Sequence, residues 1–544
     1  PDGDGIFFDD NCGLAHARLA ILDVVGSPQP LHGPGKVAVV NGEIYNHLSL
    51  KSPSYNYSTM GDSEIILSLH KGKGSAKDHA KWISKLDGMF AFALWSNDQL
   101  ILARDPVGIK PLMRTIVDDI LVFASEAKAL RAHEAYVPEI DTLAMKARIA
   151  WEYPLDATTL FADVYQVRPG TVEVWELIDG IPKMTSSSRF EIQKVEPAID
   201  WNDPAGLLES FTLSVSDRLM SDVPVGIVLS GGLDSSLVCA VAREAAEIAE
   251  QPVPACWTVA ESEDNPDWQA AEVVTSSLDL EHHQHILDPD TFHSKLPDLA
   301  WHGEDLDVTV LFFQPLFSKM SESVTVGLCG QGADELHAGY PRYRDLSKHC
   351  NEIQNRLDDM NCNLEDLEGD SWWSSNHSPQ NHTKSLKDFL QFELDHGQLS
   401  NFQLRLVDRH SMAHSLEVRV PFLGSRHRDA SNKLPMDWRL PSSLEEKAAL
   451  RSAAELTSLP TEIIRRPKLP AGRATSPRMI DSLLEDLSPY VNKVAKRYPE
   501  LERALIKQPE ISIGLGLFEA MHILDGGTHK RTGDVSSLLD EVVG

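Results

Sequence analysis

The sequence of 544 residues is long enough for two or more domains, and its composition, 42% hydrophobic and 24% charged, is that of a globular protein. A formal charge of −31 argues against a nucleic-acid-binding surface, and the absence of any run of about 18 apolar residues argues against a membrane span. The six cysteines show no paired CxxC spacing, so we expect reduced thiols of a cytoplasmic protein, without a disulfide frame or a zinc site.

The first part of the chain, residues 1–187, has the pattern of short strands separated by turns. Apolar runs predict buried strands at 37–40, 89–95, 100–103 and 120–124, and one amphipathic run predicts a helix near 63–70. Turns are predicted at Asn41-Gly42, Asn97-Asp98, Pro169-Gly170 and Asp179-Gly180. This arrangement of elements predicts an α+β layered domain.

The stretch from Met184 to Gly206 contains three serines, scattered charges and two prolines, and residues 188–206 are the predicted linker to a second domain at 207–544. In that domain apolar and amphipathic runs alternate. Strands are predicted at 224–229, 254–260 and 324–329, and helices at 236–250 and 267–278. The alternation predicts a parallel sheet flanked by helices. Beyond about residue 345 the chain is predicted to be mostly helical, with a solvated polar stretch at 351–385.

The run from Val223 to Ser236 (VPVGIVLSGGLDSS) is the most informative part of the sequence. It predicts a strand, a glycine-rich turn and a helix, and a helix N-terminus with free N–H groups binds anions. Asp234 would repel a phosphate unless a divalent cation bridged the two. The loop lacks the lysine and the spacing of a Walker A loop. It resembles the SGGxDS loop of PP-loop ATP pyrophosphatases, which cleave ATP between the α and β phosphates. The alternative is a glycine turn that only caps a helix.

Five segments in order resemble the glutamine-hydrolysing asparagine synthetases: 41–46 (NGEIYN), 105–111 (DPVGIKP), 230–236 (SGGLDSS), 330–335 (GQGADE) and 411–422 (SMAHSLEVRVPF). The resemblance extends from residue 1 to about residue 475. It implies an N-terminal Ntn-hydrolase-type sandwich that acts as a class-II glutamine amidotransferase. An α/β parallel-sheet PP-loop domain with a helical C-terminal part would follow it.

In this family a cysteine at the mature N-terminus attacks the glutamine amide, and its own α-amino group acts as base. The present sequence starts at Pro1 without that cysteine, so we expect upstream sequence to be missing and the 544-residue chain to use ammonia. Cys12 is expected to be a strand residue. The resemblance implies that Arg18 pairs with the glutamine carboxylate and that Asn41 and Gly42 line the oxyanion position. Glu43 and Asp62 would hold the α-amino group. The alternative for Asn41-Gly42 is a simple hairpin turn.

The resemblance also implies the roles of residues in the second domain. Asp234 and Asp334 would coordinate Mg²⁺, and Lys468 would stabilise the transition states of adenylation and amidation. The implied ATP-binding positions are Leu229, Ser230, Gly231, Gly232, Asp234, Ser235, Val259, Cys329 and Gly330. For Val259 the alternative is a residue of the strand core, and for Arg465 and Arg466 it is a solvated basic turn. Glu417, Arg419 and Pro421 are expected to brace the wall of the site.

Two positions depart from the family pattern. Many bacterial members carry Glu where this chain has Gln331, and a glutamine cannot accept a proton, so the general base is unassigned. The segment 302–309 (HGEDLDVT) departs from the Asp- and Pro-rich segment expected at the acceptor site, where Asp307 is the remaining candidate.

The implied reaction converts aspartate to asparagine through a β-aspartyl-AMP intermediate, with ATP and Mg²⁺ as cofactors and glutamine as nitrogen donor. Its partners would be small molecules, and family members suggest a homodimer. Two alternatives stay open: a synthetase that adenylates another acid to form an amide or lactam, and a non-catalytic nucleotide-binding paralogue. The glutamine-site residues disfavour the first alternative. The presence of Asp234, Asp334 and Lys468 disfavours the second.

Overall fold

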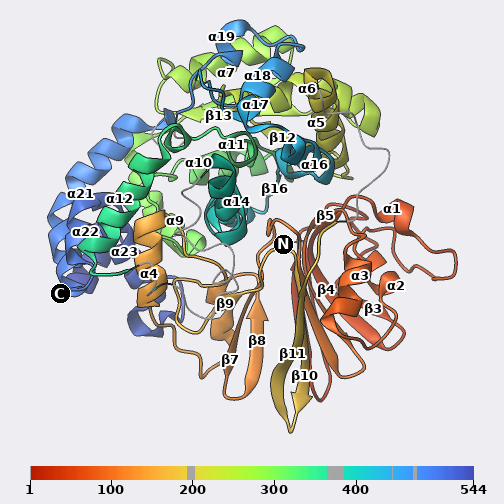
Figure 1. The fold of residues 1–544 in the computed structure, drawn as a ribbon. Helices are drawn as coiled ribbons and strands as arrows, with labels where there is room; N and C mark the ends of the chain where they lie inside the picture. The colour runs from red at the N-terminus through yellow and green to blue at the C-terminus, as the bar shows by residue number, and fades with distance from the viewer. Residues whose placement is uncertain (1, 193–202, 364–366, 368–384, 444, 470–473) are drawn as a thin grey trace. The chain divides into compact units, whose positions relative to one another are not determined.

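The computed structural model describes residues 2–192, 203–363, 367, 385–443, 445–469 and 474–544. The chain divides into two compact units (Figure 1). Unit 1 comprises Pro1–Tyr136, Asp163–Ala198 and Met220–Pro224, and unit 2 comprises Val137–Ala162, Ile199–Leu219 and Val225–Gly544. Residues 193–202 of the predicted linker lie outside the described residues, so the domain boundaries at 187 and 207 remain a prediction.

Unit 1 is built on a six-stranded antiparallel sheet in the order β11-β10-β6-β5-β4-β3. The strands are β3 (Leu31–Gly33), β4 (Lys36–Ile44), β5 (Gly88–Ser96), β6 (Gln99–Arg104), β10 (Thr171–Ile178) and β11 (Ile181–Arg189). Separate from it are the hairpin of β1 (Gly3–Phe8) and β2 (Gly13–Arg18), and a three-stranded sheet of β7 (Met113–Val117), β8 (Ile120–Ala124) and β9 (Tyr165–Gln166). The helices of this unit are α1 (His47–Leu50), α2 (Ile65–Leu69), α3 (Ala76–Ile83) and the 3₁₀ helix η1 (Ala127–Ala132).

The sheet of unit 1 has a core on each face, which makes it the middle of a layered structure. Every residue of β5 is buried. Phe90 and Phe92 pack with Trp82 and Ile83 of α3, whereas the alternate Trp95 joins a second cluster. A strand covered on both faces requires a continuous apolar run, because successive side chains point to opposite faces. The predicted strands and the α+β layering are confirmed.

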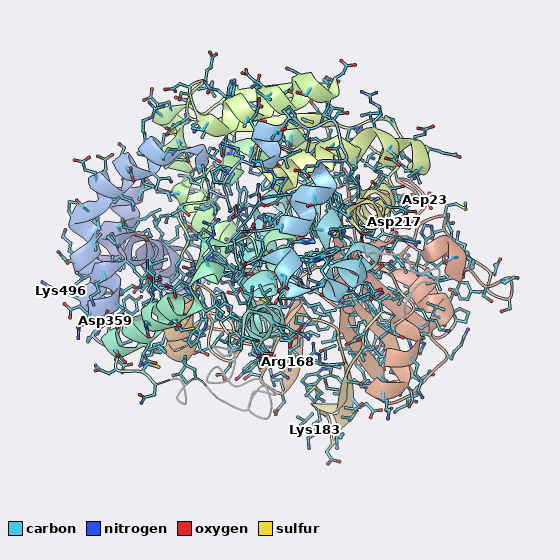
Figure 2. The ribbon with its side chains drawn as sticks, turned by 45° about the horizontal axis from the view of Figure 1, so that its top comes forward. Asp23, Arg168, Lys183, Asp217, Asp359 and Lys496 are labelled. Carbon is cyan, nitrogen blue, oxygen red and sulfur yellow. The ribbon has the colours of Figure 1, made fainter. Side chains whose placement is uncertain are left out.

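The turns of unit 1 follow their sequence signals, with one exception. Asn97 and Asp98 join β5 to β6 with φ angles of 52° and 58°, as the primed hairpin turns require. Asp179-Gly180 joins β10 to β11, and Lys183 lies near the tip of that hairpin, where its exposed side chain points to solvent (Figure 2). Asn41-Gly42, in contrast, lies inside β4 and pairs with β5. The hairpin-turn interpretation of that dipeptide is therefore wrong.

Unit 2 contains a five-stranded parallel sheet in the order β14-β13-β12-β15-β16. Its strands are β12 (Val225–Val228), β13 (Ala255–Ala260), β14 (His282–Ile286), β15 (Val326–Leu328) and β16 (Glu417–Arg419). The chain moves outward from β12 to β14 and then returns to place β15 on the other side of β12. Ligands of open α/β sheets bind at such a switch point, beyond the carboxyl ends of the strands. The loops after β12 and β15 are therefore the expected site.

Helices α5 (Pro204–Arg218), α6 (Leu233–Ala249) and α7 (Pro266–Leu278) share one apolar core with this sheet. Phe211, Leu237 and Ala271 of these helices pack in the same cluster as Ile227 and Leu328 of the strands. The predicted helices and parallel sheet are confirmed. Within the described residues, no helix is both long and apolar enough to cross a membrane.

The rest of unit 2 is mostly helical, as predicted. Its helices are α4 (Thr142–Trp151), α8 (Pro289–Phe292), α9 (Leu296–Gly303), α10 (Phe313–Ser321), α11 (Ala333–His337), α12 (Leu346–Asp359), α14 (Leu386–His396), the π-helix η6 (Gln398–Gln403), α15 (Leu404–Met412), α16 (Ser425–Lys433), α17 (Met436–Arg439), α18 (Ala448–Ala454), α19 (Thr461–Ile464), α21 (Pro477–Arg497), α22 (Glu502–Lys507), α23 (Pro509–His522) and α24 (Val535–Val543). Asp359 at the end of α12 pairs with Arg503 and Lys507 of α22, at 2.7 and 2.5 Å (Figure 2). Residues 364–366 and 368–384, in the predicted polar stretch, lie outside the described residues.

Candidate active site

The loop between β12 and α6 has the form of an anion-binding turn. Ser230 N donates to Ser235 Oγ at 3.2 Å, and Gly232 N donates to Ser230 Oγ at 3.4 Å, which folds the loop over the start of α6. Gly231 has φ +68°, and a Cβ there would lie 2.5 Å from Ala270 Cβ on α7. Only glycine fits this conformation and this space. Anion binding by this loop remains a prediction.

Two aspartates from separate loops converge at this turn. Asp234 lies in the first turn of α6, and Asp334 lies in the first turn of α11, after β15. Lys447 Nζ is 2.6 Å from both carboxylate oxygens of Asp234 and 2.6 Å from Asp334 Oδ1. Lys468 Nζ is 2.7 Å from Asp334 Oδ2 and 3.6 Å from Asp234 Oδ2. We call these four side chains the charge cluster.

The two carboxylates and two ammonium groups of the charge cluster give it a formal charge of zero. Burial disfavours the ionised form of Asp334, but Lys447 and Lys468 outweigh burial and hold the pKa of this carboxyl below its ordinary value. Burial also opposes the charge on Lys468, yet Asp334 and Asp234 raise the pKa of its ammonium group. The adjacent Glu335 behaves differently. Burial and the charge of Asp334 raise the pKa of its carboxyl to about 7.

The donor set of the cluster fits a magnesium ion. Mg²⁺ is usually held by one or two carboxylates together with phosphate oxygens and waters. Asp234 and Asp334 supply the two carboxylates, and the ammonium of Lys447 marks a position where both stabilise a cation. The parts of the chain that the structure describes contain no group of three or more His, Cys, Asp or Glu side chains able to hold a metal ion. Phosphate oxygens would therefore have to complete the coordination.

The loop after β15 makes close contact with the loop after β12. A Cβ on Gly330 would lie 2.9 Å from both Asp234 Cβ and Ser235 N, so glycine permits this approach. Gln331 follows in the same loop, and the thiol of buried Cys329 has a pKa raised to about 12 by burial. Leu229 is hydrogen-bonded to β13, because its N–H donates to the Trp257 carbonyl and its carbonyl accepts from Thr258 Oγ1. Val259 is buried at the carboxyl end of β13. Roles of these residues in ATP binding remain predictions.

Residues around the charge cluster fix the loops that carry it. The Arg419 guanidinium donates to Glu417 Oε1 at 3.0 Å and to the Arg218 carbonyl at 2.8 Å, and the Arg419 carbonyl accepts from Cys329 N. These bonds support the predicted bracing role. Arg466 donates to Asp267 Oδ1 at 2.7 Å and to the Ser230 carbonyl at 3.4 Å, so a solvated turn is the wrong interpretation for this residue.

Two residues that help to build this site, Lys447 and Asp267, were not predicted from the sequence. Lys447 stands in the charged run EEK at 445–447, which is typical of a solvated surface, yet it is only 2% exposed. Asp267 occupies the first turn of α7, where an acidic residue is common, and its partner Arg466 is 199 positions away in sequence. Neither pairing has a local sequence signal. Arg465, by contrast, is exposed and pairs with Glu445 and Glu455, as expected of a solvated basic turn.

The predicted acceptor segment is involved in ion pairs and turns. Arg148 donates to Asp305 Oδ1 at 2.7 Å, and Arg405 pairs with the other oxygen of that carboxylate. Asp307 Oδ1 accepts from Thr309 N at 2.8 Å and from Thr309 Oγ1 at 2.7 Å. Burial raises the pKa of the Asp307 carboxyl. A role for Asp307 in acceptor binding remains a prediction.

In unit 1 the predicted glutamine-binding residues lie on β2, β4 and the loops beside them. Arg18, the last residue of β2, donates to the carbonyls of Val24 at 2.7 Å, Leu22 at 2.9 Å and Asp23 at 3.1 Å. Asp23 Oδ2 accepts from Met60 N at 2.8 Å, which ties this loop to the one carrying Asp62 (Asp23 is labelled in Figure 2).

Of the other members of this set, Asn41, Gly42 and Glu43 lie on β4 and Asp62 lies in a loop that contacts the end of this strand. Asp62 Oδ2 accepts from Ile44 N at 2.6 Å, next to buried Glu43. Gly42 has φ +122°, and a Cβ there would overlap Met89 O, so this position requires glycine. Asn41 Nδ2 donates to Ser125 Oγ at 3.4 Å. Glutamine binding by these five residues remains a prediction.

Cys12 lies in the loop of the β1–β2 hairpin, one residue before β2. The prediction of a strand residue was therefore displaced by one position, because Asp9 Oδ1 accepts from Cys12 N and closes the turn. Burial, with a contribution from the charge of Asp9, raises the pKa of its thiol to about 12. A thiol of this kind is a poor nucleophile at neutral pH, which agrees with excluding Cys12 as the glutaminase cysteine.

Gly339 makes room for the charge cluster, which leads to a prediction. A Cβ at this position would overlap both Asp334 Oδ1 and Lys447 Cε. We expect Gly339→Ala to displace both groups and to lower ATP–pyrophosphate exchange by about 100-fold, the loss that a misplacement of about 1 Å can cause. The matched control is Gly3→Ala, where a Cβ meets nothing within 4 Å. Equal exchange by the two variants would contradict this prediction.

A parallel sheet with this loop at its switch point, and with two aspartates and two lysines at the loop, is consistent with an ATP pyrophosphatase domain of the PP-loop class. The sequence matches the family described as Asparagine synthase over residues 206–511 and the family described as Glutamine amidotransferase domain over residues 1–181. The chain belongs to the asparagine synthase family. The resemblance inferred from the five motifs is confirmed.

Curated relatives cover most of the chain. The glutamine-hydrolyzing asparagine synthetase 1 of Bacillus subtilis (strain 168) is 29% identical over 530 residues, covering 86% of this chain and 81% of the relative. The glutamine-hydrolyzing asparagine synthetase B of Escherichia coli (strain K12) is 28% identical over 507 residues, covering 89% and 78%. Among solved structures, the glutamine phosphoribosylpyrophosphate amidotransferase of Bacillus subtilis covers 41% of this chain and 47% of its own, with 20% identity and a TM-score of 0.21, too low to support an argument.

Proposed function

We propose that this protein forms asparagine from aspartate, ATP and glutamine, with Mg²⁺ bound by Asp234 and Asp334. The observation that carries the proposal is the convergence of Asp234, Asp334, Lys447 and Lys468 at the SGGLDSS loop. Glutamine as nitrogen donor is supported by the amidotransferase match over residues 1–181.

In the first step a side-chain carboxylate oxygen of aspartate attacks the α-phosphorus of ATP, and the bond from this phosphorus to the bridging oxygen breaks. The N–H groups of Gly231 and Gly232 would bind the pyrophosphate that leaves, with Gly232 N exchanging its 3.4 Å bond to Ser230 Oγ for a phosphate oxygen, and Lys468 would neutralise negative charge as it develops. Mg²⁺ would supply further charge neutralisation on the phosphate oxygens. In the second step ammonia attacks the acyl carbon, AMP leaves with the C–O bond electrons, and the surplus proton on the nitrogen passes to the departing phosphate or to water.

The mechanism needs ammonia in its neutral form, because an ammonium ion has no lone pair to attack the adenylate. Gln331 cannot remove a proton from the attacking nitrogen. The carboxyl of Glu335, whose pKa is raised to about 7, accepts a hydrogen bond from the Tyr340 hydroxyl. The proposed mechanism gives this residue no catalytic role. In the proposed reaction the attacking nitrogen is therefore that of free ammonia, and no residue of the protein acts as its general base.

Aspartate-stimulated ATP–pyrophosphate exchange tests the proposal. We expect the 544-residue chain with ATP, Mg²⁺, labelled pyrophosphate and aspartate to form labelled ATP, and to release AMP and asparagine when ammonium is added. Exchange that depends on another carboxylic acid would favour an amide- or lactam-forming synthetase. Absence of exchange, with ATP still bound, would favour a nucleotide-binding paralogue.

Two further expectations concern the oligomeric state of the protein and its location in the cell. A homodimer would appear as twice the mass of the 60.3 kDa chain in light scattering after size-exclusion chromatography. A cytoplasmic location, expected from the pattern of cysteines, is checked by cell fractionation of the native protein.

A further inference from the structure

Lys447 occupies the position between the carboxylates that a divalent cation would need. Its ammonium is 2.6 Å from three of their oxygens, and its side chain is only 3% exposed. A buried lysine is common in a site as a counter-charge, but this one contacts both proposed metal ligands simultaneously. A metal ion and this ammonium cannot share the position.

Several features of the chain place Lys447 there. The residue has φ 56° and forms the N-cap of α18, with its carbonyl accepting from Arg451 N at 2.9 Å. Left-handed backbone is unfavourable for a lysine, so the surrounding structure has to hold it. Gly339 leaves open the space that the Lys447 chain fills. The contact is therefore built by the fold and is more than a chance rotamer.

The charge balance decides what the site attracts. With both lysines present the cluster sums to zero, so a free divalent cation entering it gains little attraction to offset the loss of its own waters. Removing the ammonium of Lys447 leaves a net charge of −1 beside a space of cation size. ATP with bound Mg²⁺ brings its own negative phosphates, which give Lys447 and Lys468 new partners when they leave the carboxylates.

We propose that Lys447 excludes free divalent cations from the nucleotide-free site, so that Mg²⁺ enters only together with ATP. This inference rests on the proposed function, because it takes the loop at 230–236 to be the nucleotide site. In this inference the Lys447 ammonium occupies the metal position until ATP and Mg²⁺ displace it.

Binding of Mn²⁺ to the nucleotide-free protein, measured by electron paramagnetic resonance of free Mn²⁺ and by calorimetry, tests the proposal. We expect the wild-type chain to bind Mn²⁺ weakly and Lys447→Met to bind one ion about tenfold more tightly or better, because one positive charge has been removed beside the ligands. Adding Asp334→Asn to Lys447→Met should abolish the gained site. Lys447→Arg, which keeps the charge, should behave as wild type.

The matched control is Lys433→Met, which removes a lysine from a half-exposed pair with Asp429 at 2.6 Å and should leave Mn²⁺ binding unchanged. Tight Mn²⁺ binding by the wild type, or equal binding by wild type and Lys447→Met, would overturn the inference. If Lys447→Met fails to fold by circular dichroism, Lys447→Gln provides the neutral variant. ATP–pyrophosphate exchange is measured separately on the same proteins. The expected Mn²⁺ binding without any exchange would contradict the proposed function, whereas exchange without the expected Mn²⁺ binding would contradict only the role of Lys447.

Discussion

Replacement of Lys468 by methionine is expected to lower aspartate-dependent ATP–pyrophosphate exchange by about 10²–10³-fold, the loss seen when one group that stabilises transition-state charge is removed. Lys468 is the member of the charge cluster with the most exposed side chain, at 27%, so it faces the space from which a substrate would arrive. Methionine is unbranched and only one heavy atom shorter than lysine, so the change removes the ammonium group and leaves most of the side chain in place.

The stability of this variant should change little, which separates chemistry from folding. The cluster is left with a net charge of −1, but Lys447 still pairs with both Asp234 and Asp334, and the 27% exposure of the Lys468 side chain shows that solvent reaches this part of the cluster and screens the excess charge. The measurement is the initial exchange rate at saturating ATP, with the thermal midpoint recorded for the same samples. Lys433→Met is the control, and an exchange rate of Lys468→Met within a few fold of that control would contradict the assignment.

Lys468→Arg adds a test of geometry. Arginine keeps the positive charge, but its guanidinium is planar and rigid. It adapts less readily than an ammonium to a phosphoryl group whose geometry changes during the reaction. We therefore expect a rate between those of wild type and Lys468→Met. A full recovery would show that charge alone is sufficient.

The parts of the site that were predictable from sequence are those with a local signal. The loop at 230–236 lies between an apolar strand and an amphipathic helix, and Gly231 has a left-handed backbone conformation that favours glycine. The apolar run of β5 likewise predicted a buried strand, and every residue of this strand is buried. In both cases neighbouring residues in the chain determine the structure.

The missed parts depend on contacts between segments that are far apart in the chain. Lys447 lies 213 positions from Asp234, and nothing in its charged surroundings distinguishes it from a surface lysine. The strand β14 (HHQHI) is polar because it forms the edge of the sheet, and β16 has only three residues. Hydrophobic periodicity does not detect such elements, since they bury little apolar surface.

Replacement of Asp334 by asparagine is expected to abolish exchange and to destabilise unit 2 by about 3–5 kcal/mol, the cost of removing one partner from a buried ion pair. The change leaves two lysines with one carboxylate, so a buried positive charge has no counter-charge. The measurement is urea denaturation of the full chain near pH 7, together with the exchange assay.

The effect should depend on pH, with a sign that follows from the lowered pKa of Asp334. A carboxyl whose pKa is lower in the folded than in the unfolded state stabilises the fold above its ordinary pKa of 3.8, and this contribution is lost as the pH falls below that value. The stability difference between wild type and Asp334→Asn should thus be largest near neutral pH and should shrink in acid. A difference that is constant with pH would contradict the ionised state of Asp334.

A second substitution separates charge balance from catalysis. Asp334→Asn with Lys447→Met leaves Asp234 and Lys468 as a balanced pair, 3.6 Å apart, and should recover most of the lost stability. It should not recover exchange, because only one of the two carboxylates proposed to hold Mg²⁺ is left. Recovery of exchange in this double variant would show that Asp334 serves only as the partner of Lys447, and the proposed metal site would then need another ligand.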